Sequence, residues 1–250
     1  MISLAGRTAL VTGGSRGIGR AAALLLARAG ADVAITFQSR SDAAEAVAGE
    51  IRALGRRALA VGGDLADPAV NARLQAELKG AFGKIDCFVA NAGIWPADET
   101  PLATLPAERW RHTLAANLDA VYLSTQAALR LMQPGGRIVL VSSTAGQRGE
   151  AFHSDYAATK GAIIALTKSL AIECAPDIQV NCVAPGWVDT EMCTTAFAGE
   201  GRERVRRTIP LGRIPPPEDI AGPILFLCSD LARHLTGEIL NVNGGSVLCG

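Results

Sequence analysis

Tyr156 and Lys160 are the residues whose types and spacing most directly suggest chemistry. They lie four positions apart in the segment DYAATKG, which reads as helix, so both side chains fall on one helix face. A free tyrosine keeps its proton up to about pH 10, and a nearby positive charge lowers this pKa by favouring the phenolate. Such a pair can transfer a proton near neutral pH. On its own, however, Tyr-x-x-x-Lys is more often a half-buried aromatic residue beside a surface lysine.

A glycine-rich segment with the sequence TGGSRGIG follows the first predicted strand and leads into an alanine-rich helical stretch. Its glycines permit a tight turn and a close approach of the backbone, and the free N–H groups at the helix start can bind a pyrophosphate. The spacing Gly-x-x-x-Gly-x-Gly differs from the commoner Gly-x-Gly-x-x-Gly fingerprint. Its place between strand and helix predicts a dinucleotide site. The predicted contacts are Gly13, Ser15, Arg16, Gly17, Ile18 and Gly19.

The end of the second predicted strand bears on which dinucleotide binds. A carboxylate at this position often receives the ribose hydroxyls of the adenosine, but here the strand ends at Phe37 and the nearby Asp32 lies at its start. Without an anion at this point, Arg16, Ser39 and Arg40 could bind a ribose 2′-phosphate. The sequence therefore favours NADP over NAD. The alternative for Arg40 is an ordinary loop cation.

The elements that position these residues alternate between strand and helix. Short apolar runs predict strands at residues 8–11, 32–37, 58–61, 87–90, 137–141, 178–183 and 239–242. Helical patterns lie between them, at residues 17–29, 42–54, 68–82, 106–132, 155–174 and 217–230. This alternation is typical of an α/β fold, a doubly wound parallel seven-stranded sheet of the Rossmann type with helices on both faces. Residues 1–250 are predicted to form a single domain.

One irregular stretch interrupts this alternation. Residues 190–213 are polar and arginine-rich and lie between a strand and a helix. Long excursions of this kind often form lids over a binding site, and the alternative is a helical hairpin on the surface. The sequence leaves both interpretations open.

Composition limits the classes of partner. Twenty-four Lys and Arg residues balance twenty-four Asp and Glu residues, so no global field attracts nucleic acid or an anionic membrane. Six cysteines show no spacing typical of metal ligands, and we expect them to be buried thiols. No apolar run is long enough to span a bilayer. These features predict a cytoplasmic protein with a small-molecule substrate, no metal site, no nucleic-acid partner and no membrane partner.

Taken together, these segments resemble the short-chain dehydrogenase/reductase family over the whole chain. Six motifs occur in the family's order: residues 12–19, Asp64-Leu65, Asn91-Ala92-Gly93, Asn117, Ser143 with Tyr156 and Lys160, and Pro185-Gly186 with Thr190. Closing segments such as PLGR, FLCSD and VNGG are similar to the branch of 3-oxoacyl-[acyl-carrier-protein] reductases.

The resemblance implies catalytic roles for four residues. Tyr156 would give a proton to the substrate carbonyl oxygen, and Lys160 would favour the phenolate and bind the nicotinamide ribose. Ser143 would hydrogen-bond the same oxygen; its neighbour Ser142 competes for this role, but the spacing to Tyr156 favours Ser143. Asn117 lies within a predicted helix, where it suits a kink and a proton relay to Lys160.

The resemblance also implies the remaining cofactor contacts. Asp64 and Leu65 follow the third strand and would contact the adenine. Asn91, Ala92 and Gly93 follow the fourth strand, where small side chains would let the backbone approach the cofactor. Four residues near the end of the sixth strand would hold the nicotinamide: Pro185, Gly186, Val188 and Thr190. All follow predicted strands, and open α/β sheets bind ligands at the carboxyl ends of their strands.

The sequence thus predicts an NADP(H)-dependent oxidoreductase that reduces a ketone, either a 3-oxoacyl thioester or a small carbonyl compound. The alternatives are an NAD-dependent dehydrogenase of a sugar, steroid or polyketide alcohol, and a non-catalytic NADP(H) sensor. A substrate linked to acyl carrier protein would need a basic surface, for which the arginines of residues 202–207 are candidates. Trp95, Trp187 and His153 are candidate walls of the substrate pocket. The resemblance implies a homotetramer.

Overall fold

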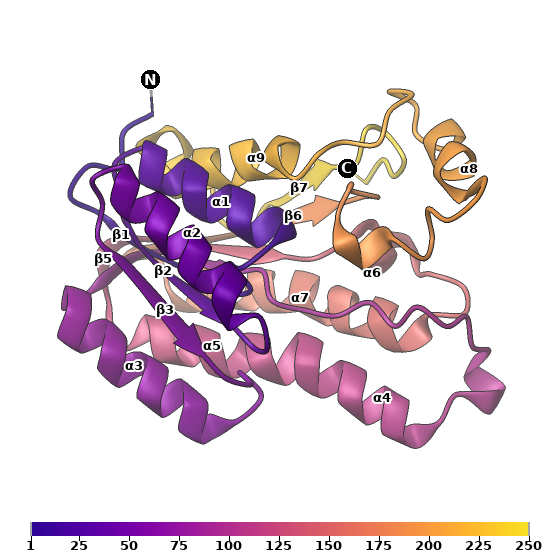
Figure 1. Ribbon diagram of the computed structural model, residues 1–250, viewed down its shortest axis with the longest axis horizontal. Coiled ribbons are helices and arrows are strands. Elements are labelled where there is room, and N and C mark those ends of the chain that lie inside the picture. The colour runs from indigo at the N-terminus through magenta and orange to yellow at the C-terminus, as the bar shows by residue number, and fades with distance from the viewer. Residues whose placement is uncertain (1, 250) are drawn as a thin grey trace.

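The computed structural model describes residues 2–249, and its centre is one parallel sheet of seven strands in the order β3-β2-β1-β4-β5-β6-β7 (Figure 1). The strands are β1 (Thr8–Val11), β2 (Asp32–Phe37), β3 (Ala58–Gly62), β4 (Ile85–Ala90), β5 (Met132–Val141), β6 (Ile178–Pro185) and β7 (Ile239–Val242). The order reverses beside β1, where the chain passes from β3 back across to β4. In open α/β sheets ligands bind at this switch point, so the topology predicts a ligand site at the carboxyl ends of β1 and β4.

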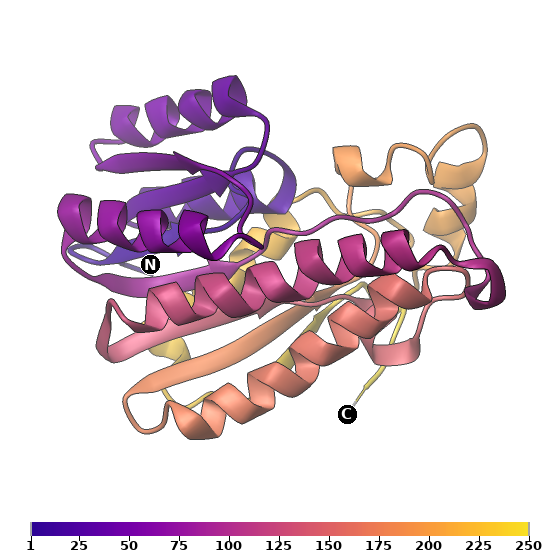
Figure 2. The same ribbon diagram turned by 90° about the horizontal axis from the view of Figure 1, so that it is seen from below.

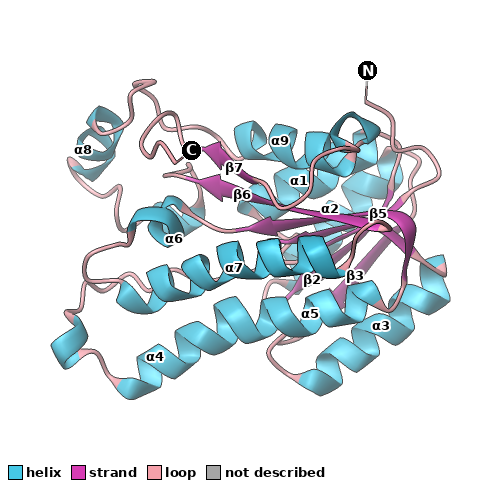
Figure 3. Cartoon of the chain, turned by 180° about the vertical axis from the view of Figure 1, so that it is seen from behind, coloured by secondary structure: helices cyan, strands magenta, loops and turns pink. Residues whose placement is uncertain are grey.

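Helices cover both faces of the sheet (Figures 1 and 3), and Figure 2 shows the helices of one face in front of the strands. One layer contains α1 (Gly17–Arg28), α2 (Ser41–Ala53) and α9 (Glu218–Cys228), and the other contains α3 (Pro68–Phe82), α5 (Ala120–Leu129) and α7 (Ser154–Glu173). Successive strand residues divide between the layers: Val11 belongs to the first core and Leu10 to the second. Burial on both faces explains the nearly continuous apolar strands, and the predicted seven-stranded, doubly wound sheet is confirmed.

The helix predicted at residues 106–132 differs from the observed structure. It consists of α4 (Ala107–Leu114), the π-helical segment η2 (Ala115–Asp119) and α5, and α5 ends at Leu129. Met132 is already paired with Ile85 in the sheet, and the Leu131 carbonyl accepts a hydrogen bond from the Ile85 N–H. The predicted end of the helix at residue 132 was therefore too late, because pairing with β4 draws the chain into the sheet directly after α5.

Other boundaries follow local sequence signals. The Asp67 side chain accepts a hydrogen bond of 2.8 Å from the Ala69 N–H, and Pro68 occupies the first turn of α3, as the sequence predicts. Ser143 caps the short helix α6 (Thr144–Arg148) by accepting a 3.1 Å hydrogen bond from the Ala145 N–H. This cap fixes the position of a residue that the sequence marks as catalytic.

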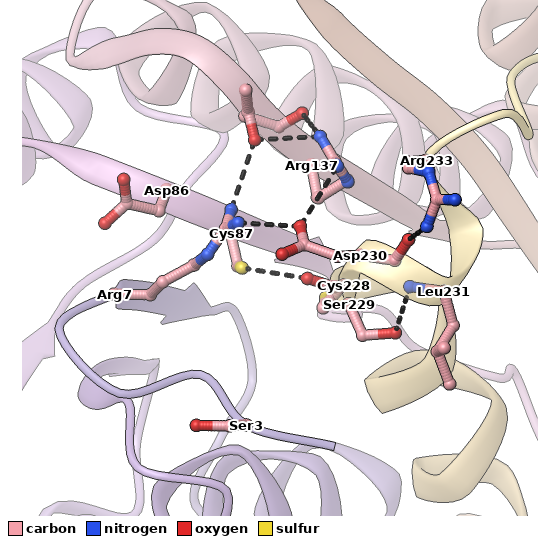
Figure 4. Close-up of polar contacts among 12 residues, drawn as sticks. Ser3, Arg7, Asp86, Cys87, Arg137, Cys228, Ser229, Asp230, Leu231 and Arg233 are labelled. Carbon is pink, nitrogen blue, oxygen red and sulfur yellow. Dashed lines mark hydrogen bonds and ion pairs between the residues drawn. The ribbon is translucent and has the colours of Figure 1, made fainter.

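An ion-pair cluster closes the amino edge of the sheet, opposite the carboxyl ends of the strands (Figure 4). Arg7 and Arg137 both approach Asp230 Oδ1, at 2.8 and 3.5 Å, and Arg7 also donates to the Gly135 carbonyl at 3.2 Å. Burial, followed by the charge of Arg7, lowers the pKa of Arg137. The cluster joins the residue before β1 and the middle of β5 to the 3-10 helix η4 (Asp230–Ala232).

The six cysteines are free thiols, and the expectation that they are buried holds for three of them. Cys87, Cys182 and Cys228 are buried, whereas Cys174 and Cys193 are partly exposed and Cys249 is exposed. Within residues 2–249, no helix combines the length and the apolar character needed to cross a bilayer. The same residues contain no group of three or more His, Cys, Asp or Glu side chains arranged to hold a metal ion.

Candidate active site

A cleft runs along the carboxyl ends of the strands, and the predicted cofactor residues gather in it. Its larger cavity is lined by segments that follow β1, β2, β3, β4 and β6. Thirteen predicted contacts line this cavity: Gly13, Ser15, Arg16, Gly17, Ile18, Ser39, Arg40, Asp64, Leu65, Asn91, Ala92, Gly93 and Thr190. The structure therefore brings together residues from five segments that are widely separated in the sequence.

A second cavity adjoins the first. It is lined by the predicted catalytic residues Ser143, Tyr156 and Lys160 and by Pro185, Gly186 and Val188. Ile18, Asn91, Gly93 and Thr190 line both cavities, so the two are parts of one cleft. Tyr156 and Lys160 thus face the same cleft as the glycine-rich turn. Gly19 and Asn117 lie behind the cleft rather than in its lining.

The glycine-rich turn has the shape of a phosphate cradle. Gly13 and Gly17 have φ angles of +65° and +53°, which L-residues with a side chain rarely adopt. A Cβ atom on Gly19 would lie 2.2 Å from the Gly13 carbonyl oxygen, so only glycine allows α1 to begin this close to the turn. The turn leaves its backbone open toward the start of α1, and these residues fit a dinucleotide pyrophosphate.

Thr12 joins two of the cofactor loops, a contact that the spacing of the motif does not reveal. Its Oγ1 accepts hydrogen bonds from the N–H groups of Asn91 (2.9 Å) and Ala92 (3.0 Å). The Asn91 side chain in turn donates to the Thr12 carbonyl at 3.0 Å. The turns after β1 and β4 are therefore held together, next to the switch point of the sheet.

The end of β2 carries no carboxylate that faces the cavity. Asp32, at the start of β2, pairs with Arg57 at 2.7 Å, at the opposite edge of the sheet. Arg16 and Arg40 instead pair with Glu191, at 2.9 and 3.0 Å, and all three line the larger cavity. Glu191 was not predicted as a site residue.

Tyr156 lies almost completely inside the protein. Burial raises the pKa of Tyr156 to about 12, and the hydroxyl of Ser143 acts in the opposite direction. Ser142 Oγ donates 2.7 Å to the Lys160 carbonyl and is thereby occupied, whereas Ser143 Oγ faces the tyrosine. This geometry supports Ser143 over Ser142 as the partner of a substrate oxygen.

Lys160 lies next to Tyr156 but does not lower its pKa in this state. Its Nζ is 5.6 Å from the centre of the Tyr156 ring and donates to the Val141 carbonyl at 3.0 Å. Burial lowers the pKa of Lys160 to about 8. The direction for Tyr156 is opposite to the sequence-based expectation, because burial disfavours the charged phenolate and outweighs the hydrogen bond with Ser143.

Asn117 lies in the π-helical segment between α4 and α5, so the irregularity expected there is present. Its Oδ1 accepts a 2.7 Å hydrogen bond from the Ile94 N–H, and its Nδ2 donates to the Ile94 carbonyl at 3.0 Å. The side chain is fully buried. Asn117 therefore fixes the backbone of the loop after β4, just before Trp95.

Aromatic side chains form the outer wall of the second cavity. Trp95 packs edge-on against Tyr156, with ring centres 4.7 Å apart, and against Trp187 at 6.0 Å. His153 is not part of the lining: it stacks behind Trp95 at 4.0 Å and supports it. Glu150 adds a carboxylate to this cavity.

The segment at residues 190–213 combines a lining stretch and an outer helix. Glu191, Met192 and Cys193 form the 3-10 helix η3 (Glu191–Cys193), and all three contribute to the cavities. The seven-residue helix α8 (Gly201–Arg207) lies farther out (Figure 1). The segment therefore contains one α-helix and does not form a helical hairpin, and residues 191–193 line the cleft.

A buried ion pair, which the sequence does not indicate, supports the catalytic helix. Asp155, directly before Tyr156, is fully buried and accepts hydrogen bonds from Arg109 Nε at 3.0 Å and Thr113 Oγ1 at 2.9 Å. Burial raises the pKa of Asp155, but these hydrogen bonds outweigh it and leave the pKa below its ordinary value. Arg109 also donates to the Asp98 carbonyl and to Thr100 Oγ1, so it ties the loop after β4 to α7.

Replacing Asp155 with asparagine is expected to destabilise the fold by about 3 kcal/mol, because it leaves the Arg109 charge largely buried without an anion. Since the folded-state pKa is lowered, the contribution of this carboxylate is present above its ordinary pKa and disappears as the pH falls through the lowered value. Urea unfolding at pH 7 measures the change. Glu45→Gln, which removes an exposed partner of Arg52, is the control and should change stability by less than about 1 kcal/mol. Equal effects of the two substitutions would contradict the role of the buried pair.

Comparison with known proteins extends over nearly the whole chain. The family model described as "Enoyl-(Acyl carrier protein) reductase" matches residues 13–246. A solved structure of a short chain dehydrogenase from Burkholderia cenocepacia in complex with NADP has a TM-score of 0.91 and 40% identity, and the match covers 97% of this chain and 98% of that chain.

Two curated relatives have comparable similarity and different names. L-rhamnose 1-dehydrogenase (NAD(P)(+)) of Sphingomonas sp. is 42% identical over 247 residues, which cover 97% of this chain and 96% of the relative. The 3-oxoacyl-[acyl-carrier-protein] reductase FabG of Aquifex aeolicus is 42% identical over 249 residues and 98% of each chain. From this similarity, the matching fold and the order of the motifs, the chain belongs to the short-chain dehydrogenase/reductase family of nicotinamide-dependent oxidoreductases, in the branch similar to the 3-oxoacyl-[acyl-carrier-protein] reductases.

Proposed function

We propose that the protein is an NADP(H)-dependent oxidoreductase that interconverts a carbonyl compound and its alcohol. One observation carries this proposal: Tyr156, Ser143 and Lys160 face the part of the cleft that joins the glycine-rich cavity. A substrate oxygen placed between the two hydroxyl groups would lie next to a bound nicotinamide.

In the direction of reduction, the residues act as proton donor and oxygen binder. The hydroxyl of Ser143 hydrogen-bonds the carbonyl oxygen as negative charge develops there. Tyr156, whose pKa of about 12 keeps it protonated, donates its proton to that oxygen. When bound, the nicotinamide supplies the hydride. Lys160 binds the ribose beside it and stabilises the phenolate that remains on Tyr156.

The predicted cofactor contacts fit this arrangement. The glycine-rich turn would bind the pyrophosphate, and Asp64 and Leu65 line the part of the cavity that would hold the adenine. Four residues at and after the end of β6 would hold the nicotinamide amide, and they all line the catalytic cavity: Pro185, Gly186, Val188 and Thr190. Asn117 acts by fixing the loop after β4, and a proton relay through it to Lys160 is part of the proposal.

The preference for NADP(H) is supported by charge at the end of β2. Arg16 and Arg40 approach the cavity there, and Asp32 is occupied by Arg57 at the other edge of the sheet. Two guanidinium groups suit a 2′-phosphate, and β2 itself does not end in an acid that would repel it. The similar Burkholderia structure contains NADP, whereas the rhamnose dehydrogenase is named for both cofactors.

Acids offset part of the positive charge of α8. Arg202 pairs with Asp189 at 2.6 Å, and Glu203 pairs with Arg206 and Arg207 at 2.6 and 3.0 Å, whereas Arg204 is exposed and forms no ion pair within residues 2–249. Two carboxylates thus offset two of four arginines. An acidic carrier protein would meet this reduced charge, which favours a free small molecule over a carrier-linked thioester as the substrate.

Oxidation of a sugar is the second candidate. Trp95 and Trp187 provide flat apolar faces, and Glu150 provides an acceptor for hydroxyl groups in the same cavity. A sugar presents this combination of C–H faces and hydroxyl groups. The similarity to L-rhamnose 1-dehydrogenase supports this candidate as well. The steroid and polyketide alternatives have no comparable support.

A spectrophotometric screen at 340 nm tests both candidates. Small ketones and aldehydes, including a 3-oxoacyl thioester, are offered with NADPH and NADH, and aldoses are offered with NADP⁺ and NAD⁺. We expect turnover with the NADP(H) pair to exceed that with NAD(H), and a free substrate to be preferred over a carrier-linked one. Binding of NADPH without turnover of any compound would favour the sensor. We further propose a homotetramer, for which light scattering on the purified chain is the test.

A further inference from the structure

Glu191 joins the two arginines at the adenosine end of the cleft. Its Oε2 accepts from Arg16 Nη1 at 2.9 Å and from Arg40 Nη2 at 3.0 Å. The arginines belong to the turns after β1 and β2, whereas Glu191 begins η3, in the segment after β6. One carboxylate oxygen therefore connects three segments around the mouth of the larger cavity.

The Glu191 carboxylate is the ion-pair partner of both arginines. Within residues 2–249, neither Arg16 nor Arg40 forms an ion pair with any other acid. Two guanidinium groups that approach one point repel each other unless an anion lies between them. In this structure Glu191 supplies that anion, and it belongs to the segment after β6 rather than to the end of β2.

A ribose 2′-phosphate would need the same two guanidinium groups. A phosphate dianion and a carboxylate cannot share one position, and they repel each other if both remain nearby. The 2′-hydroxyl of NAD(H) carries no charge and leaves the pairs of Glu191 intact. Binding of NADP(H) thus requires a change at Glu191 that binding of NAD(H) does not require.

We propose that Glu191 is a specificity-determining residue for the cofactor: it competes with the 2′-phosphate for Arg16 and Arg40. It thereby weakens NADP(H) binding relative to what the two arginines alone would give, and it brings the affinities for NADP(H) and NAD(H) closer together. This inference rests on the proposed function, in which the two arginines bind the 2′-phosphate.

The test is the substitution Glu191→Gln in the full chain, with dissociation constants for NADPH and NADH measured by nicotinamide fluorescence. Because exposed ion pairs are individually weak, we expect the variant to bind NADPH about threefold to tenfold more tightly. NADH affinity should stay within about twofold, since its ribose offers no competing anion. Glu191 is more than half exposed, so the variant should fold normally.

Glu200→Gln is the matched control. Glu200 is an exposed carboxylate of the same segment and pairs with neither arginine, so its loss changes the net charge equally without touching Arg16 or Arg40. It should leave the ratio of the two dissociation constants unchanged. If Glu200→Gln raises NADPH affinity as much as Glu191→Gln, general charge explains the effect and the proposal is wrong.

A double variant tests whether Glu191 acts through the arginines. In an Arg40→Ala background, Glu191→Gln should give a smaller gain in NADPH affinity, because one of the two contested guanidinium groups is absent. An unchanged NADPH-to-NADH ratio in Glu191→Gln overturns the role of Glu191. If Arg40→Ala leaves the NADPH affinity of the parent chain unchanged, or if the parent binds neither nucleotide, the proposed cofactor site itself is wrong.

Discussion

Replacing Tyr156 with phenylalanine is expected to lower kcat by about 10²–10⁴-fold, because the substrate oxygen loses its proton donor. The ring stays in place, so its edge-on contact with Trp95 and its buried packing are retained. The affinity for NADPH should change by no more than about twofold, since the hydroxyl contributes little to the binding of the distant pyrophosphate. Steady-state kinetics together with a fluorescence titration separate the two effects.

The chain contains its own matched control. Tyr122, the other of the two tyrosines, is half exposed on α5 and lies outside both cavities. Tyr122→Phe removes the same hydroxyl group from the surface and should leave kcat unchanged. Retained turnover in Tyr156→Phe would refute the assignment of the proton donor and with it the proposed mechanism.

Replacing Lys160 with methionine is expected to separate activity from stability. Turnover should fall by about 10²-fold or more, because the phenolate and the nicotinamide ribose lose their cation. The fold, in contrast, should become more stable at pH 7. Burial lowers the pKa of Lys160 from 10.5 to about 8, so keeping it charged in the folded state costs about 3 kcal/mol. Loss of its hydrogen bond to Val141 offsets about 1 kcal/mol of the gain.

The pH dependence gives the sign of this effect independently. Because the folded-state pKa lies below the unfolded one, the unfolded chain binds more protons between the two values, and the stability of the parent rises with pH there. From about pH 7 to about pH 9.5 the parent should gain about 2 kcal/mol relative to Lys160→Met. Urea unfolding at the two pH values measures the difference in unfolding free energy between the parent and Lys160→Met. If this difference is the same at both pH values, Lys160 is not a buried cation with a lowered pKa.

The sequence predicted the sheet and most of the cleft because their signals are local. Apolar strand runs marked all seven strands, and the carboxyl ends of parallel strands necessarily share one edge. The position of Asp67 before a proline located the start of α3. The predicted end of the helix at residue 132 was wrong because a contact with Ile85, far away in sequence, decides it.

Other features could not be predicted because they depend on tertiary structure. Glu191 lies 175 residues from Arg16, and no periodic pattern connects them. The pair of Arg109 and Asp155 likewise joins two helices whose contact only the fold defines. The pKa of Tyr156 moves upward because burial, which spacing on a helix does not report, disfavours the phenolate.

The two sides of the substrate pocket are anchored with different strength. Asn117 holds Ile94 through two hydrogen bonds from its fully buried side chain, and Arg109 fixes the loop beyond it through the fully buried Asp155. The opposite side begins at Glu191, whose ion pairs are half exposed and individually weak. The loop held by Asn117 and Arg109 is thus fixed next to the proton donor. The segment that begins at Glu191 can change with little loss of folding stability. Selection for a new substrate should therefore accumulate changes after residue 190.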